Sequence, residues 1–290
     1  MSNYKSPKVI AEIGCNHKGD FDIAKQLIQV ASDCGVDVVK FQKRNNSQLL
    51  TKEQYNAPHP NPINSYGITY GEHREFLEFD VSQHILLKEI AENLGLIYST
   101  SVWDLFSAKE IIKIDPLFIK VPSACNNNFE MLEVLRDAYK GDVHISFGMT
   151  NQKEELEIFN FFDARKQSKR LVFYSCTSAY PVPFSDISLL EIERIKKTYA
   201  KDIKSVGFSG HHLGIAVDIA AYTLGSEWIE RHFTLDRTWK GTDHSASLEP
   251  TGLRKLARDL KATHKALVYK SEEILPIEKE QRKKLKYRKK

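Results

Sequence analysis

The chain has 290 residues, of which 41% are hydrophobic and 10% aromatic; this is enough for one large α/β domain or two ordinary ones and excludes a disordered protein. No apolar run reaches the roughly 18 residues that a membrane helix needs, and the N-terminus lacks the features of a secretory signal. We therefore expect a cytoplasmic protein with no membrane partner.

The formal net charge of +4 comes from the C-terminal end, because the last nine residues (282–290) hold seven Lys or Arg and no acid. The rest of the chain has more acidic than basic residues, so no nucleic-acid partner is expected. We interpret the basic run as a solvated end, with a basic binding patch as the alternative. Four scattered cysteines without a CxxC pair predict reduced thiols, and neither disulfides nor a zinc site.

Short runs rich in β-branched and aromatic residues recur along the chain, separated by amphipathic stretches. Most of them are almost continuously hydrophobic, as expected for strands that are covered on both faces. The predicted strands are residues 9–14, 36–42, 96–100, 118–123, 143–148, 171–177, 205–210 and 227–234. Residues 21–35, 82–95 and 250–267 have the apolar spacing of helices.

Eight strands that alternate with helices predict a TIM (β/α)₈ barrel, a single α/β domain over residues 1–270. A doubly wound open sheet is the alternative, but the strand number and the absence of GxGxxG favour the barrel. Residues 271–290 are predicted to form a basic linker or tail. Residues 43–80 are polar with little apolar periodicity, so we expect a long, functional loop after the second strand.

A TIM barrel carries its chemistry at the carboxyl ends of its strands. Charged and hydroxyl-bearing residues gather at these ends in the predicted strands. They are Glu12, Lys40, Gln42, Thr100, Ser101, Lys120, Ser123, Ser146, Thr177, Ser178, Tyr180, Ser209, His211, Arg231 and His232.

Two lysines and several hydroxyls at one end of a barrel suit a phosphorylated or carboxylated substrate. His211 and His232, on adjacent closing strands, suit a divalent metal that activates a carbonyl. A structural interpretation stays open for each residue. A lone strand histidine is more often a hydrogen-bonded core residue, and the lysines have Glu12 or Glu230 as buried partners.

Seven motifs stand out along residues 8–280: AEIGCNHKGD, DVVKFQK, TYGEHREFLE, IKVPS, YSCTSAYP, GFSGHHLGIA and IERHFTLDRTWKGTDHSASLEP. Together they resemble the sialic acid synthase family, and the match is strongest in the long polar block after residue 228. TYGEHRE, TSAYP and TWKGTDHSASLEP are most similar to the animal-type enzymes, which act on a 6-phosphorylated hexosamine.

The resemblance implies a reaction between phosphoenolpyruvate and an N-acylhexosamine, an N-acylmannosamine-type aldose or its 6-phosphate. The products are a nine-carbon 2-keto sugar acid and phosphate, and the cofactor is a divalent metal, Mn or Mg. A different aldose acceptor is one alternative. A catalytically weakened or silent barrel that binds phosphoenolpyruvate or a sugar acid is another.

The resemblance also assigns roles to individual residues. His211 and His232 would hold the metal, and Glu12 would act on a proton or orient water. The family's phosphoenolpyruvate site maps to Lys40, Thr100, Lys120, Ser123, Ser146 and Ser209, and its sugar site to Gln42, Asn64, Tyr180 and Asp243. Lys43 or Arg44 is a further candidate for a sugar 6-phosphate.

The chain departs from the family pattern in two places that bear on activity. Cys125 stands where relatives carry a carboxylate near the metal, and a thiol does not replace it at neutral pH unless its pKa falls. After the barrel, relatives continue into an antifreeze-like domain, which we expect this chain to lack. A homodimer is still expected from the resemblance.

Overall fold

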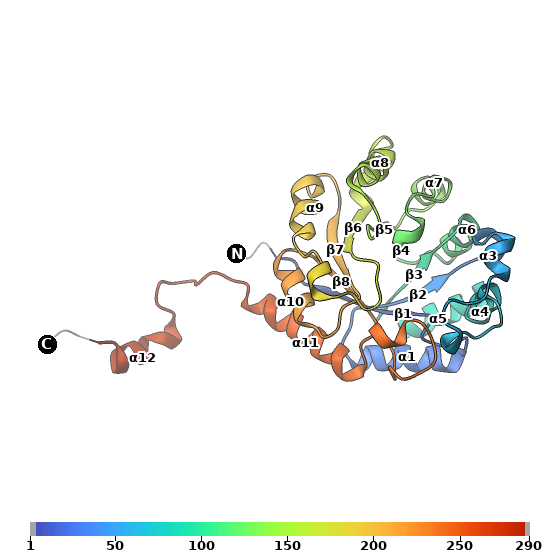
Figure 1. Ribbon diagram of the computed structural model, residues 1–290. Helices are drawn as coiled ribbons and strands as arrows, with labels where there is room; N and C mark the ends of the chain where they lie inside the picture. The colour runs from blue at the N-terminus through green and yellow to red at the C-terminus, as the bar shows by residue number, and fades with distance from the viewer. Residues whose placement is uncertain (1–3, 288–290) are drawn as a thin grey trace.

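The computed structural model describes residues 4–287 and contains a closed barrel of eight parallel strands in sequential order (Figure 1). The predicted TIM barrel is confirmed, and an open doubly wound sheet is excluded. The strands are β1 (Lys8–Gly14), β2 (Val38–Lys43), β3 (Ile97–Val102), β4 (Phe118–Val121), β5 (Asp142–Ser146), β6 (Leu171–Cys176), β7 (Ser205–Gly210) and β8 (Trp228–His232). Pairing of β8 with β1 closes the barrel.

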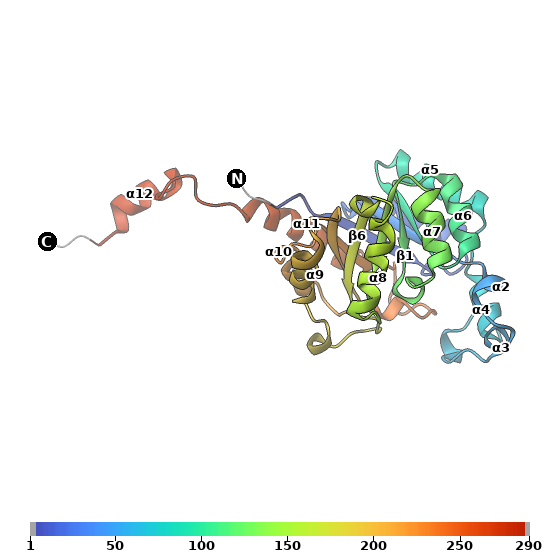
Figure 2. The same ribbon diagram turned by 90° about the horizontal axis from the view of Figure 1, so that it is seen from above.

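Helices surround the barrel and connect each strand to the next (Figures 1 and 2). The helices that cover the strands are α1 (Phe21–Asp33), α5 (Val81–Asn93), α6 (Leu105–Ile114), α7 (Phe129–Asp137), α8 (Gln152–Asp163), α9 (Glu191–Tyr199), α10 (Ala216–Thr223) and α11 (Pro250–Ala266). They pack their apolar stripes on the outer face of the strands, where most of the hydrophobic core lies.

Helix α1 shows how the sequence determines where such a helix begins, which face it buries and where it ends. Asp20 begins it as the N-cap, with its carboxylate accepting from the backbone N–H groups of Asp22 and Ile23. Leu27 and Ile28 are buried on the face that meets the barrel. Gly35 follows the helix with a φ of +79°, a left-handed conformation that glycine adopts without strain and that ends the helix.

The inner face of the barrel changes from apolar to polar along the strands. Its amino-terminal half is filled by a separate apolar cluster, which consists of Ile10, Val38, Phe118, Val172 and Tyr174 with Ile97 and Trp228 packed against it. The carboxyl-terminal half carries charged and hydroxyl-bearing residues that line a cavity. The apolar half therefore forms a floor beneath a polar cavity.

Strand β8 shows the alternation that produces this division. Glu230 and His232 face the cavity, whereas Ile229 belongs to the outer core. Arg231 also faces outward and pairs with Asp218 of α10. Successive side chains of a strand point to opposite faces, so one buried strand supplies both a site and a core contact.

The segment between β2 and α5 differs from the expected loop. It contains the short helices α2 (Asn46–Leu49), α3 (Lys52–Asn56) and α4 (Tyr70–Phe76) and the 3₁₀ turn Pro62–Asn64. Thr51 with Gln54, and Thr69 with Glu72, form reciprocal capping boxes that start two of these helices. The capping residues were the sequence signal, because helices this short show little apolar periodicity.

After α11, residues 267–275 lead to helix α12 (Pro276–Leu285), which extends away from the barrel (Figures 1 and 2). None of the residues of α12 is buried. Residues 288–290 of the predicted basic tail lie outside the described residues. Within residues 4–287, no helix is long and apolar enough to cross a membrane.

Replacement of Gly207 by Ala tests the close packing of the barrel interior. A Cβ at this position of β7 would lie 2.5 Å from the ring of Tyr174, which has no free space because it is fully buried. We expect Gly207→Ala to lower the free energy of unfolding by about 1–3 kcal/mol, measured by denaturant unfolding. Gly252→Ala, where the new Cβ meets only the Leu248 side chain, is the control; equal stability of both variants would contradict this packing.

Candidate active site

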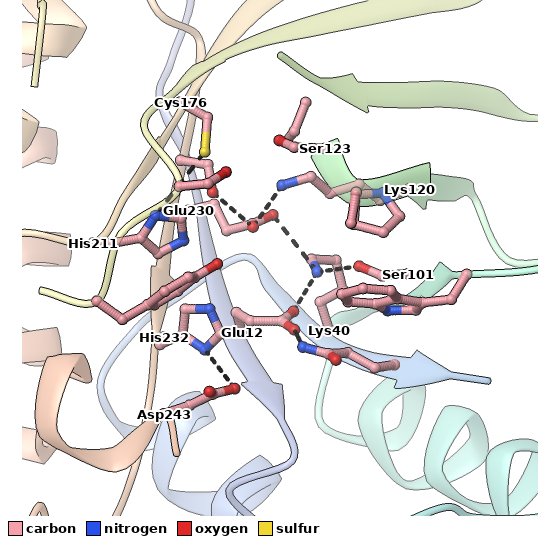
Figure 3. Close-up of a pocket in the computed structure, with 18 of the residues that line it drawn as sticks. Glu12, Lys40, Ser101, Lys120, Ser123, Cys176, His211, Glu230, His232 and Asp243 are labelled. Atoms are coloured by element: carbon pink, nitrogen blue, oxygen red, sulfur yellow. Dashed lines mark hydrogen bonds and ion pairs between the residues drawn. The ribbon is translucent and has the colours of Figure 1, made fainter. Parts of the chain in front are cut away.

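A cavity of about 290 Å³ opens at the carboxyl ends of the strands. Most of the residues predicted for the site line it together, although they come from all parts of the chain (Figure 3). These residues are Glu12, Lys40, Gln42, Lys120, Ser123, Ser146, Tyr180, Ser209, His211, His232 and Asp243.

Two predicted residues do not line the cavity. Thr100 faces α5 on the outside of the barrel, where its hydroxyl lies 2.7 Å from that of Tyr98. Because side chains alternate along β3, its neighbour Ser101 faces the cavity instead. Asn64 lies beside the rim, with its Oδ1 accepting from the backbone N–H of Gly241 at 3.4 Å.

Two lysines and two glutamates form a buried charge network inside the cavity (Figure 3). Lys40 pairs with Glu12 and donates to the hydroxyl of Ser101 at 2.6 Å. Lys120 donates to Oε1 of Glu230 at 2.6 Å, and Oε2 of Glu230 lies 3.8 Å from Nζ of Lys40. Each side chain of the network is at most 5% exposed, so the pairs are almost fully removed from water.

The two glutamates differ in protonation. Burial raises the pKa of Glu12 from 4.5 to about 7, against the lowering effect of Lys40 and of the hydrogen bond from Gln42. Burial also favours the neutral form of Glu230, but Lys120 and Lys40 together hold the pKa of Glu230 below its usual range. Near neutral pH, Glu230 is therefore a fixed negative charge, whereas Glu12 can take up or release a proton.

His211 and His232 lie side by side at the cavity wall, with ring centroids 5.5 Å apart. Nδ1 of His211 donates to the carbonyl oxygen of Thr177 at 2.9 Å, so Nε2 is the nitrogen of this ring that is left for a ligand. Nδ1 of His232 is buried without a hydrogen-bond partner among the described residues, and burial lowers the pKa of this imidazole. Burial thus favours the neutral form of His232, which is the form of an imidazole that binds a metal.

Imidazole nitrogens are common ligands of divalent metals, and the two rings stand beside each other at the cavity wall. Among the described residues, no group of three or more His, Cys, Asp and Glu side chains is arranged to hold a metal ion, so a metal at these rings would need further ligands from water or substrate. Asp243 Oδ2 lies 3.8 Å from Nδ1 of His232, and the Tyr180 ring lies 4.3 Å from that of His211.

Two arginines extend the cavity on the side of β2, and the sequence analysis had considered only one of them. Arg44 lies two positions after Gln42 and faces the cavity like it. Its side chain is buried, with 4% of the residue exposed, and its guanidinium lies 3.9 Å from the centroid of the Trp103 ring. Arg74 of α4 donates to the Tyr70 hydroxyl at 2.9 and 3.0 Å and makes no ion pair within residues 4–287. Both arginines line the cavity.

Lys43 does not reach this cavity, contrary to one of the two options for a sugar phosphate. Its Nζ lies 3.9 Å from Glu78 and 3.8 Å from Glu110, on the outer side of β2. This orientation follows from the strand alternation, because Gln42 occupies the inward position.

Cys125 is part of the outer hydrophobic core and does not line the cavity, although its neighbours Ser123 and Ala124 do. Burial raises the pKa of the Cys125 thiol to about 12, so it stays neutral. The thiol therefore does not take over the role of a carboxylate at this position. It acts as a small apolar side chain.

Glu230, Cys176 and Arg74 also line the cavity, and the predicted site lacked them. Ser101 and Ser178, which the sequence analysis placed at strand ends without assigning them a role, line it as well. The period of a strand was the missed signal for Glu230, which precedes His232 by two positions and so shares its face. By the same rule, Ser101 shares the inward face of Ser99, and Cys176 shares the inward face of Tyr174. Arg74 lies on α4, outside the barrel strands, and no local pattern predicts its position.

Comparison with known proteins identifies the family. The profile of the NeuB family matches residues 27–272. N-acetylneuraminate-9-phosphate synthase of Homo sapiens is 39% identical over 271 residues, which cover 93% of this chain and 74% of the human protein. The chain belongs to the NeuB family. An N,N'-diacetyllegionaminic acid synthase of Campylobacter jejuni is 32% identical and aligns with 91% of this chain and 78% of its own length.

A solved sialic acid synthetase structure has the same architecture. The N-acetylneuraminic acid synthetase of Leptospira borgpetersenii, crystallised in complex with citrate, superposes with a TM-score of 0.80 at 27% identity. The superposition covers 98% of this chain and 94% of the Leptospira chain. The predicted family is thus confirmed by both sequence and fold.

The pKa of Glu12 generates a prediction for the pH dependence of the NeuB-family reaction. Because a general base must be ionised, kcat/KM for phosphoenolpyruvate is expected to rise with pH and to level off above about 7. Glu12→Gln should lower the rate about 10²–10⁴-fold and remove this inflection. The ionisation of the substrate itself is common to both enzymes, so an unchanged pH profile in the variant would contradict the role of Glu12.

Proposed function

We propose that this chain condenses phosphoenolpyruvate with the open-chain aldehyde of an N-acylated hexosamine, giving a nine-carbon 2-keto sugar acid and phosphate. Family membership supports the reaction, since the relatives are named as synthases of N-acetylneuraminate 9-phosphate and of diacetyllegionaminic acid. The observation that carries the proposal is a pair of lysines that shares one cavity with a pair of histidines.

Lys40 and Lys120 are proposed to bind the two anionic groups of phosphoenolpyruvate. Both lysines line a cavity that also contains the predicted phosphoenolpyruvate-binding serines Ser123, Ser146 and Ser209. The Oγ atom of Ser146 is buried without a partner, so a hydroxyl donor is free for the ligand. Charge-assisted hydrogen bonds in such a desolvated site hold phosphate and carboxylate oxygens strongly.

His211 and His232 are proposed to bind Mn or Mg through their Nε2 atoms. The metal would supply Lewis-acid polarisation of the acceptor's aldehyde oxygen. Tyr180 and Asp243 lie beside the imidazoles, and Gln42 lines the same cavity, so these three side chains would contact the acceptor.

The reaction forms one carbon–carbon bond and breaks one bond to phosphate. C3 of the enol attacks the aldehyde carbon, a water molecule adds at C2, and phosphate leaves from the resulting tetrahedral centre. Glu12 would accept a proton from this water, for which a pKa of about 7 is well matched. Its neighbour Lys40 would stabilise negative charge on the substrate during the attack.

We further propose that the acceptor carries a phosphate, as the name of the human N-acetylneuraminate-9-phosphate synthase implies for that protein. Arg44 and Arg74 support this proposal, because they add two cations beyond those that phosphoenolpyruvate requires. Arginine binds phosphate oxygens in a bidentate manner. Homodimerisation, which the resemblance implies, and a cytoplasmic location, which the sequence features indicate, stay predictions.

Phosphate release from phosphoenolpyruvate in the presence of Mn tests the reaction and the acceptor together. N-acetylmannosamine and its 6-phosphate are offered in parallel, with EDTA as the metal control. We expect EDTA-sensitive release with the 6-phosphate and little with the free sugar. Release with neither sugar, despite saturable phosphoenolpyruvate binding, would favour a different acceptor or the silent barrel.

The variant His232→Ala tests the metal site. It should lower kcat by at least about 10³-fold, because removal of one of two protein ligands abolishes tight binding of the Lewis acid. The variant should still bind phosphoenolpyruvate, since the lysines are untouched, and calorimetry checks this. A rate near that of the unaltered protein would contradict the metal assignment.

A further inference from the structure

A buried cluster of charged side chains lies on the outer face of the barrel, behind the two imidazoles. Arg231 precedes His232 on β8, and its side chain is 1% exposed. Its Nη1 donates to Oδ2 of Asp218 on α10 at 2.5 Å and to the carbonyl oxygen of Gly214 at 2.8 Å. Its Nη2 donates to the carbonyl oxygen of His212. One guanidinium thus joins β8, the β7–α10 loop and α10.

The strand ladder itself does not fix His211 relative to His232. The β7–β8 register ends where Gly210 pairs with Arg231, so His211 is the first residue beyond it. The hydrogen bonds of His211 go to the segment after β6, where its Nδ1 meets Thr177 and its carbonyl oxygen accepts from Val182 at 3.0 Å. The hydrogen bonds that Arg231 donates to the carbonyl oxygens of His212 and Gly214 link the β7–α10 loop to β8.

The hydrogen bonding of this cluster is poorly suited to stabilising the fold. Nε of Arg231, Oδ1 of Asp218 and Nδ1 of His212 are buried without hydrogen-bond partners among the described residues. Unsatisfied buried polar atoms cost free energy, and a buried ion pair often adds no more stability than apolar side chains of the same size. A role in positioning accounts for the cluster better than a role in stability.

We propose that Arg231 and Asp218 are positioning residues that set the separation of His211 and His232 and so determine the affinity of the metal site. The inference rests on the proposed function, because it assumes that these two histidines bind a metal. Partners that orient metal ligands from outside the site typically change the affinity 10–100-fold when they are removed.

Titration of the full chain with Mn, without substrate, tests the proposal through its dissociation constant, measured by electron paramagnetic resonance. Arg231→Met keeps the side-chain length but removes the donors, and we expect it to raise the Kd at least tenfold. Arg231→Lys, whose ammonium cannot bind two carbonyl oxygens and a carboxylate in the same geometry, should show a smaller rise. Asp218→Asn, nearly isosteric, should also raise the Kd.

Arg194→Met is the matched control. Arg194 of α9 donates to both carboxylate oxygens of Glu155, at 2.7 and 3.0 Å, and Glu155 is 4% exposed on its side chain. The Arg194 side chain is 24% exposed, so this pair is less buried than the Arg231 pair, but it is likewise an ion pair between two elements of the fold and lies away from the β7–α10 loop. The control should lose thermal stability and keep the Mn Kd within about twofold of the unaltered protein.

The outcomes separate the two proposals. Tight Mn binding by the unaltered protein with an unchanged Kd in Arg231→Met would overturn the positioning role and leave the metal site intact. No Mn binding by the unaltered protein would overturn the metal site and the positioning role together. Should Arg231→Met fail to fold, the milder Arg231→Lys and Asp218→Asn carry the same comparison, and unchanged Kd values in both would overturn the proposal.

Discussion

Two buried Lys–Glu pairs inside the barrel are the interaction on which the rest of the structure depends. Burial of four ionisable groups is costly, and the cost is tolerable only because Lys40 and Lys120 each contact a glutamate. The pairs keep two cations desolvated in the cavity before any ligand is present. An incoming phosphate or carboxylate then meets donors that need little further desolvation.

The two glutamates of this network have different pKa values, so only one of them changes its protonation near neutral pH. Glu230 stays ionised between the two lysines, whereas the pKa of Glu12 lies near 7. An anionic substrate beside Lys40 would raise the pKa of Glu12 further. The ionised Glu12 carboxylate then becomes a stronger acceptor for a proton from water.

The alternation of β8 explains how a strand can carry three ionisable residues in succession. Glu230 and His232 face the cavity, whereas Arg231 faces α10 and binds the loop that follows His211. The apolar floor of the barrel lies below, where His144 stacks on Phe118 with centroids 3.9 Å apart. The residues that line the cavity, the arginine that supports them and the apolar residues beneath them thus all come from the same short strands.

Much of this arrangement could be predicted from the sequence, because a TIM barrel places the carboxyl ends of its strands together. The alternation of hydrophobic runs gave the eight strands, and polar residues at their ends gave most of the cavity. Thr100 was assigned wrongly, since the run of hydroxyls in β3 does not show which residue faces inward. Arg74 and the short helices after β2 depend on tertiary contacts and caps that periodicity does not reveal.

A crystal structure with phosphoenolpyruvate and Mn tests the central claim most directly, because the anomalous signal of Mn locates the metal independently of the ligand density. The account predicts phosphoenolpyruvate oxygens against Nζ of Lys40 and Lys120, and an anomalous peak between the imidazoles of His211 and His232. Phosphoenolpyruvate outside this cavity, or Mn bound away from both histidines, would contradict the account.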